Sequence, residues 1–206
     1  MTRITRISET KKGRFALFSG DEFLFSIDGE TYMATGLEAG CDLSDADLLA
    51  LKDRSDTRKA SDAALRYLSL RAYGEQELYQ KLLGRFDEHS AAAAVAKMCE
   101  LDLLDDETFA REKAKGMAQR GKSPREIRQK LAALGIDRQV AAAAVDELEI
   151  DGADAALAII RKSYMEKLCA GQHQKVMAAL ARRGFSHGEI SRALAAAQAE
   201  GEEVDG

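Results

Sequence analysis

The sequence predicts a mainly α-helical protein made of three tandem three-helix repeats in an elongated, curved array, preceded by a small N-terminal β-hairpin and a short helix. Three observations support this prediction: a motif that recurs every 49 residues, capping residues that recur with it, and basic and acidic stretches that alternate in the same rhythm. A fixed period of this size is typical of stacked helical units that bury their apolar faces against one another.

The repeated motif is a polar helix start followed by an apolar residue and then a leucine four positions later. It begins at Gly74, at Ser123 and, in a weaker form, at Gln172. An alanine-rich segment follows each copy. Alanine has the highest helix propensity and little bulk, so these segments favour closely packed helices.

Residues 1–43 are expected to form a separate N-terminal β-hairpin segment. Two apolar runs, at 14–18 and 22–27, flank the turn-like sequence Ser19-Gly20-Asp21. Residues 31–35 are expected to add a third strand. A lone hairpin is only marginally stable in water, so this segment should pack on the helices or stay mobile.

Helical segments follow from Ser44, the expected N-cap of a short helix with an acidic first turn. The predicted division is 44–101 for this helix and the first repeat, 102–150 and 151–199 for the other repeats, and 200–206 for an acidic, disordered tail. The expected repeat helices are 57–71, 75–84 and 88–101; 106–120, 124–134 and 138–149; and 153–170, 173–183 and 187–199.

Capping residues place several of these boundaries. Ser123 is followed by proline at the first helical position and by Glu126 at the third, which is the pattern of a capped helix start. Gly135 and Gly184 lie 49 residues apart, where the middle helices should end. The expected N-caps of the third helices are Asp87, Asp137 and Ser186.

The net charge of −5 conceals three basic blocks. Residues 58–85, 110–136 and 155–185 carry net charges of +3, +6 and +5, and acidic segments separate them. Solvated helix faces are the ordinary explanation of such runs, and for each residue alone we favour it. The threefold recurrence instead favours a basic track for an anionic polymer along the array.

The candidate site is a set of basic side chains that would contact DNA or a protein partner. Arg111 and Lys115 share a helix face, and the turn around Lys122 precedes a helix N-terminus, which suits a phosphate. Tyr67, Tyr73 and Tyr79 could stack on bases, although core packing is the favoured use of Tyr67. The full candidate set is Arg66, Arg71, Lys81, Arg111, Lys115, Arg120, Lys122, Arg125, Arg128, Lys130, Lys162, Lys167, Arg182 and Arg183.

An enzyme is not expected, and no catalytic residue, metal ligand or cofactor is predicted. The sequence has no glycine-rich phosphate loop and no nucleophile elbow. The pair Asp105-Asp106 is interpreted as a helix cap and first turn rather than as a metal or acid–base pair. Three widely spaced cysteines predict neither a disulfide framework nor a metal cluster. Without a visible signal peptide or an apolar membrane span, we expect a cytoplasmic protein with no membrane contact.

Three sequence stretches carry a resemblance to a known family. They are Tyr67-Leu68-Ser69-Leu70-Arg71, Glu77-Leu78-x-x-x-Leu82 and Leu104-Asp105-Asp106-x-x-Phe109-Ala110. Together with Gly121-Lys122-Ser123-x-x-x-Ile127 and Arg183-Gly184-Phe185, they resemble the RecX family of recombinase regulators over residues 57–197. Two positions depart from the family pattern: Gly74 replaces a usual serine, and Arg85-Phe86 lacks a usual glycine.

The resemblance implies a bacterial cytoplasmic protein that binds the RecA nucleoprotein filament. Such proteins lie in the filament groove and suppress strand exchange, ATP hydrolysis and repressor cleavage, and hence act in homologous recombination, DNA repair and the SOS response. They also bind single- or double-stranded DNA, and we expect this binding to be weaker without RecA. We expect the protein to be a monomer. Two alternatives remain open: a DNA-binding repeat protein that acts independently of RecA, and a helical scaffold for protein partners.

Overall fold

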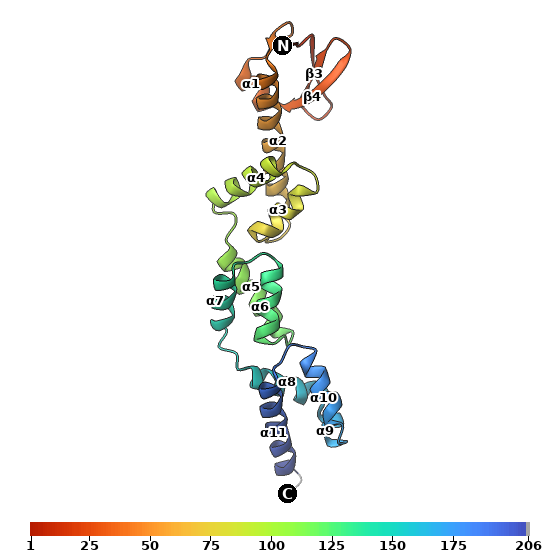
Figure 1. The fold of residues 1–206 in the computed structure, drawn as a ribbon, viewed down its shortest axis with the longest axis vertical. Coiled ribbons are helices and arrows are strands. Elements are labelled where there is room, and N and C mark those ends of the chain that lie inside the picture. The colour runs from red at the N-terminus through yellow and green to blue at the C-terminus, as the bar shows by residue number, and fades with distance from the viewer. Residues whose placement is uncertain (205–206) are drawn as a thin grey trace. The chain divides into compact units, whose positions relative to one another are not determined.

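The computed structural model describes residues 1–204, with side chains for residues 1–200. This range contains eleven helices and five short strands. The chain divides into two compact units, Met1–Leu104 and Asp105–Gly206, whose elements are labelled in Figure 1. The predicted class of three-helix repeats behind a small β element is confirmed. The elongation and curvature of the array and the five-part domain division stay predictions.

The predicted hairpin is confirmed and belongs to a three-stranded antiparallel sheet. Strand β3 (Arg14–Ser19) pairs with β4 (Glu22–Asp28) on one side and with β2 (Arg6–Glu9) on the other. A separate pair joins β1 (Thr2–Arg3) to β5 (Asp42–Leu43). Strands β1, β2 and β5 were not predicted, because they are short and contain no long apolar run.

The third strand predicted at 31–35 is wrong. These residues lie in helix α1 (Gly29–Thr35), whose N-cap is Asp28. The Asp28 carboxylate accepts hydrogen bonds from the backbone N–H of Thr31, at 2.9 Å, and from its hydroxyl, at 2.7 Å. This cap satisfies the first turn of the helix and outweighs the strand propensity of threonine and tyrosine.

The predicted short helix and the first helix of the first repeat are one helix, which corrects the sequence analysis. Helix α2 (Asp45–Leu68) has 24 residues and begins at Ser44 with a complete capping box to Asp47. Its interior contains neither glycine nor proline, so nothing in the sequence ends it. Leu51 packs in the core of the N-terminal β element, whereas Ala60 packs in the core of the first repeat.

The remaining helices follow the predicted order closely. The first repeat continues with α3 (Glu75–Leu83) and α4 (Glu88–Glu100), and the second contains α5 (Asp106–Gln119), α6 (Pro124–Ala133) and α7 (Arg138–Asp146). The third contains α8 (Gly152–Ser163), α9 (Met165–Cys169), α10 (His173–Ala181) and α11 (His187–Val204).

Two further predictions concern the third repeat. The helix predicted over 153–170 is interrupted at Tyr164, where φ of −135° leaves the helical range, so it forms α8 and α9. The disordered tail predicted at 200–206 is replaced by helix as far as Val204 in the backbone. Residues 205–206 lie outside the described residues.

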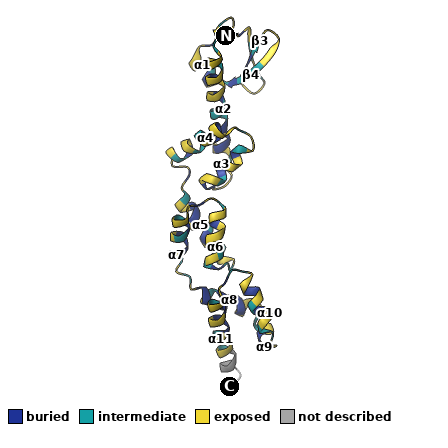
Figure 2. Cartoon of the chain, in the orientation of Figure 1, coloured by how far each residue is buried: buried dark blue, intermediate teal, exposed yellow. Residues whose placement is uncertain are grey.

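Each repeat encloses its own core, and the repeated motif supplies its centre. The apolar motif position is Leu78, Ile127 and Val176 in successive repeats, and the leucine four positions later is Leu82, Leu131 and Leu180. All six side chains are 0% exposed, and Figure 2 shows buried segments within each repeat. The 49-residue period therefore marks the residues that hold each three-helix unit together.

The turns that end the middle helices differ between repeats. Gly135 and Gly184 have φ of +87° and +83°, and the next residue donates its N–H back into the helix in each case. Gly84 instead keeps a helical φ of −65°, and Phe86 N–H bonds the carbonyl of Leu82 at 3.0 Å. The first repeat thus closes this turn without a left-handed residue, which explains why it tolerates the missing glycine.

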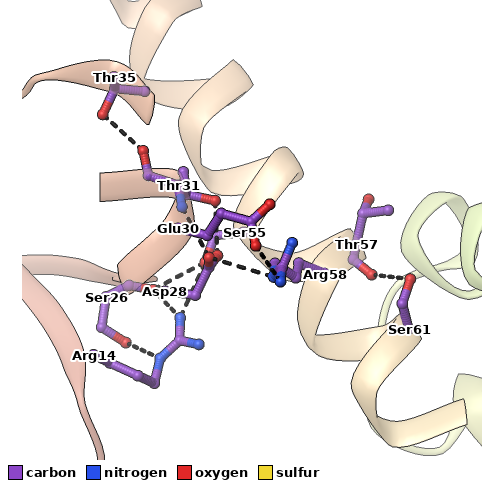
Figure 3. Close-up of polar contacts among 10 residues, drawn as sticks. All are labelled: Arg14, Ser26, Asp28, Glu30, Thr31, Thr35, Ser55, Thr57, Arg58 and Ser61. Carbon is purple, nitrogen blue, oxygen red and sulfur yellow. Dashed lines mark hydrogen bonds and ion pairs between the residues drawn. The ribbon is translucent and has the colours of Figure 1, made fainter. Parts of the chain in front are cut away.

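A polar network joins the β element to α2 (Figure 3). The Arg14 guanidinium donates to the Ser26 carbonyl at 2.5 Å, to the Ser26 hydroxyl at 3.1 Å and to the Ser55 hydroxyl at 3.0 Å. Arg58, on the same helix, forms ion pairs with Asp28 and Glu30. These arginines tie the hairpin and α1 to α2, so their charge is used within the fold.

Candidate anion-binding interface

The predicted basic residues of the first repeat are largely engaged in its own structure. Arg71 donates to both carboxylate oxygens of Glu77, at 2.7 and 3.0 Å, and its guanidinium lies 3.6 Å from the centre of the Tyr73 ring. The Glu77 hydrogen bonds raise the pKa of Arg71. Lys81 lies 5.6 Å from the centre of the Tyr67 ring, and Arg66 is exposed.

The tyrosines of this region are packing residues. Tyr73 is 8% exposed and belongs to the buried core of the first repeat, so its ring is not available to stack on a base. Tyr67 and Tyr79 are half-buried against the same core. The structure therefore favours the packing interpretation that the sequence analysis preferred for Tyr67, and extends it to Tyr73 and Tyr79.

Several predicted residues of the second repeat also pair with acids. Arg111 lies between Glu107 and Glu147, at 3.4 and 3.8 Å. Arg128 pairs with Asp146 at 2.6 Å. Lys122 and Lys130 both approach Glu126, at 2.7 and 3.9 Å. These pairs neutralise part of the second basic block, while Lys115 is exposed and forms no ion pair in the described part of the chain.

Three predicted residues from two different repeats line one cleft. Arg120 lies at the end of α5, Lys162 lies on α8, and Arg183 follows α10, around a space of about 420 Å³. No acidic side chain lines this cleft. Within residues 1–200, none of the three forms an ion pair. We call this the junction cleft.

The turns beside the junction cleft explain why these residues converge. Gly121 has φ of +72°, and a Cβ atom there would lie 3.2 Å from Ile159 Cδ1 and 3.5 Å from Arg183 Nη1. A Cβ atom at Gly184 would lie 2.7 Å from Ser123 Oγ. Two glycine turns thus let the second and third repeats approach closely enough to share the cleft.

The cluster predicted around the Lys122 turn is divided by the structure. Lys122 turns to Glu126, whereas Arg120 lines the junction cleft. Arg125 lines a separate groove between α6 and α7, together with Arg128 and Arg138. The helix start at Ser123 is filled by its own cap, since Glu126 N–H donates to Ser123 Oγ at 3.1 Å.

Arg138 was not among the predicted residues because it lies in an acidic stretch. A usable signal was present, since Arg138, Ala141 and Ala142 share one face of α7 by helical spacing. The other predicted residues of the third block lie apart from the junction cleft lining: Lys167 is 5.4 Å from the Tyr164 ring centre, and Arg182 is exposed at the end of α10.

The Asp105-Asp106 pair has the structural role predicted for it. Asp105 is the N-cap of α5, and its carboxylate accepts from the N–H groups of Glu107 and Thr108, at 2.9 and 3.1 Å. Hydrogen bonds from Thr108 lower the pKa of Asp105. Among the described residues, no group of three His, Cys, Asp or Glu side chains is arranged to hold a metal ion. No helix in this range combines the length and apolar character that a membrane crossing needs.

The junction cleft is chemically suited to an anion. Two guanidinium groups and one ammonium group supply several hydrogen-bond donors and three positive charges around one space. Guanidinium groups match the geometry of phosphate oxygens, and a concave site of one charge sign concentrates its field. This charge and donor arrangement is the kind that suits a phosphate group.

Family models match parts of the first two of the three repeats. Residues 60–98 match the RecX first three-helix domain, and residues 105–145 match the RecX second three-helix domain. The Regulatory protein RecX of Stenotrophomonas maltophilia (strain R551-3) is 35% identical over 133 residues, which cover 63% of this chain and 82% of that protein. The one from Lactobacillus delbrueckii subsp. bulgaricus (strain ATCC BAA-365 / Lb-18) is 31% identical, covering 94% and 74%.

Solved structures show the same architecture. A crystal structure of regulatory protein RecX has a TM-score of 0.67 at 24% identity and covers 93% of this chain and 98% of its own. The crystal structure of RecX from Lactobacillus salivarius has a TM-score of 0.61 at 25% identity, covering 69% and 97%. At these identities the structural likeness supports the fold.

Proposed function

Because the chain belongs to the RecX family of regulatory proteins, we propose that it is a negative modulator of RecA. In this proposal it binds the RecA nucleoprotein filament and inhibits the recombinase, ATPase and coprotease functions of RecA in DNA repair and the SOS response. It acts in the cytoplasm as a monomer, by binding rather than by catalysing a reaction.

One observation carries the proposal beyond family membership: the convergence of Arg120, Lys162 and Arg183 on the acid-free junction cleft. A nucleoprotein filament presents phosphates along a continuous path, and a cationic cleft shared by two repeats can hold that path at a fixed point. The remaining repeat surfaces would contact the recombinase. A protein that contacts DNA and RecA at the same time would hinder filament extension or bridge neighbouring RecA subunits.

The test is the DNA-dependent ATP hydrolysis of RecA on single-stranded DNA, with the protein added at substoichiometric levels. The wild type should inhibit hydrolysis well below one copy per RecA. A variant that combines Arg120→Gln, Lys162→Gln and Arg183→Gln should need a concentration at least about tenfold higher for the same inhibition, since each lost phosphate contact weakens binding.

The matched control removes three exposed positive charges from the first unit, as Lys12→Gln, Arg54→Gln and Lys97→Gln, none of which has an ion-pair partner in the described chain. This control should inhibit like the wild type. Equal loss in both triple variants would show that net charge alone matters. No inhibition by the wild type would refute the proposed function.

The second candidate is a DNA-binding protein that acts without RecA, and the same cleft supports it. That function requires tight binding of the isolated chain to DNA with a steep dependence on salt. Tight DNA binding combined with an unchanged RecA ATPase would favour it. A scaffold for protein partners would instead leave every DNA-linked activity unaffected by the cleft substitutions.

A further inference from the structure

A second basic surface differs from the junction cleft in its floor. It lies between α6 and α7 and encloses about 540 Å³. We call it the α6–α7 groove. It is lined by Arg125, Arg128, Gln129, Ala132, Ile136, Arg138, Ala141 and Ala142.

The rim of the α6–α7 groove is positively charged. Arg125 and Arg138 are both exposed, and neither forms an ion pair within the described residues. Arg128 also lines the groove, but its guanidinium is paired with Asp146 at 2.6 Å. No acidic side chain lines the groove itself. Two uncompensated guanidinium groups therefore face any ligand that enters it.

The floor of the groove is apolar and aliphatic. Ala132, Ala141 and Ala142 are small, so they leave room above the buried Ile136 side chain. No aromatic side chain lines the groove. Single-stranded nucleic acid sites usually stack bases on aromatic rings, and a phosphodiester backbone offers nothing apolar for such a floor. The chemistry favours an occupant that combines carboxylates with an aliphatic side chain.

We propose that the α6–α7 groove binds an acidic peptide segment of a partner protein, with an aliphatic side chain seated on the alanine floor and flanking carboxylates on Arg125 and Arg138. Arginine pairs with carboxylates through two parallel hydrogen bonds, so the rim selects acidic segments. Among acidic segments, the apolar floor favours those that carry an aliphatic side chain at the matching position. This site is separate from the junction cleft and does not depend on the identity of the proposed filament partner.

The test uses the full chain and two fluorescent acidic peptides that differ at one position. One carries a central leucine between runs of glutamate and aspartate, and the other carries serine in its place. Fluorescence anisotropy at fixed salt should show about tenfold tighter binding of the leucine peptide, because burial of that side chain removes apolar surface from water. Combined Arg125→Ala and Arg138→Ala should weaken both peptides about tenfold or more.

Two further variants keep the test specific. Ala142→Leu fills the floor without changing charge, so it should weaken the leucine peptide and leave the serine peptide unchanged. The matched control Lys12→Ala with Lys97→Ala removes two exposed charges elsewhere and should bind both peptides like the wild type. Thermal unfolding followed by circular dichroism checks that all variants fold.

Four results would overturn the proposal. Equal affinities for the two peptides would remove the role of the floor, and equal losses in the groove and control variants would remove the role of the rim. An oligonucleotide whose binding depends on Arg125 and Arg138 while the peptides do not bind would make the groove a nucleic-acid surface. Self-association of the wild type that is lost on Arg125→Ala with Arg138→Ala would assign it to a second copy of this chain.

Discussion

The two units of the molecule use their arginines differently. In the first unit, Arg14 and Arg58 join the β element to α2, and Arg71 clamps the turn before α3. In the second unit, Arg120 and Arg183 have no ion-pair partner within the described residues and line the junction cleft. The first basic block therefore commits Arg58 and Arg71 to the fold, whereas the second and third blocks leave Arg120 and Arg183 without counter-charges beside paired residues such as Arg128.

The difference depends on where the acids lie rather than on how many basic residues are present. Arg71 meets Glu77 six residues later, across one turn. Arg120 and Arg183 belong to turns whose neighbouring positions are glycines, with no acid among the residues that line the cleft. A positive block marks a candidate binding surface only when its own helices do not supply the counter-charges.

The largest expected effect tests whether the second unit depends on the contact between its repeats. Gly184→Ala should lower the free energy of unfolding by about 3 kcal/mol, because alanine is strained at φ of +83° and its Cβ would displace the Ser123 cap. Gly171→Ala, at φ of +72° with open space around it, should cost only about 1 kcal/mol. Urea denaturation measures both, and equal losses would contradict the packing contribution.

Arg14→Ala should lower the free energy of unfolding by about 2 kcal/mol, because it leaves the Ser26 carbonyl and the Ser55 hydroxyl without their charged donor. The affinity for DNA should stay unchanged. Arg120→Ala should show the reverse pattern, with weaker DNA binding and nearly unchanged stability. Urea denaturation and DNA binding are measured on both variants, and an arginine that affects stability and binding alike would contradict this division of roles.

The dependence of DNA affinity on salt should also differ between arginines and lysines of the two units. Lys162→Gln should reduce the slope of log affinity against log salt by about one, as expected for the loss of one phosphate contact. Arg71→Gln should leave the slope unchanged because that guanidinium is held by Glu77. Filter binding across a salt series measures the two slopes. A reduced slope for Arg71→Gln would place the first unit on the DNA as well.

The smallest expected effect is a loss of folding stability at acidic pH. Hydrogen bonding from the Ser90 backbone N–H lowers the pKa of Asp87, the N-cap of α4. A lowered folded-state pKa gives stability that is present above about pH 4 and is lost as the pH falls through the folded value. Asp87→Ser keeps a cap that does not titrate. On acidification its free energy of unfolding should therefore fall by about 0.5 kcal/mol less than that of the wild type, after allowance for solvent screening. Urea denaturation at several pH values measures this difference.

Much of the fold was predictable because its signals are local. Ser123, Asp87 and Asp137 are N-caps as predicted, and the motif residues are the buried centres of their units. Errors arose where a boundary had no local marker or a cap outweighed propensity. Helix α2 lacks an internal breaker, and the Asp28 cap makes a helix of a strand-like sequence.

The candidate site was predictable only as a set of charges. Sequence spacing placed Arg120, Lys122 and Arg125 together, yet they face the junction cleft, Glu126 and the α6–α7 groove, respectively. The meeting of Arg120 with Lys162 and Arg183 joins residues about 40 and 60 positions apart. Such a juxtaposition depends on how repeats pack, which the helix period of a single repeat does not specify.

The uninterrupted α2 helix fixes both the distance and the rotation between the N-terminal β element and the first repeat. Its 24 residues span about 36 Å, and each added residue would rotate one end against the other by about 100°. A one-residue insertion near the middle of α2 would therefore misalign two surfaces that a loop would have kept adjustable, whereas a seven-residue insertion would nearly restore their phase. The binding of any partner that contacts both ends of α2 would therefore depend on the length of this helix.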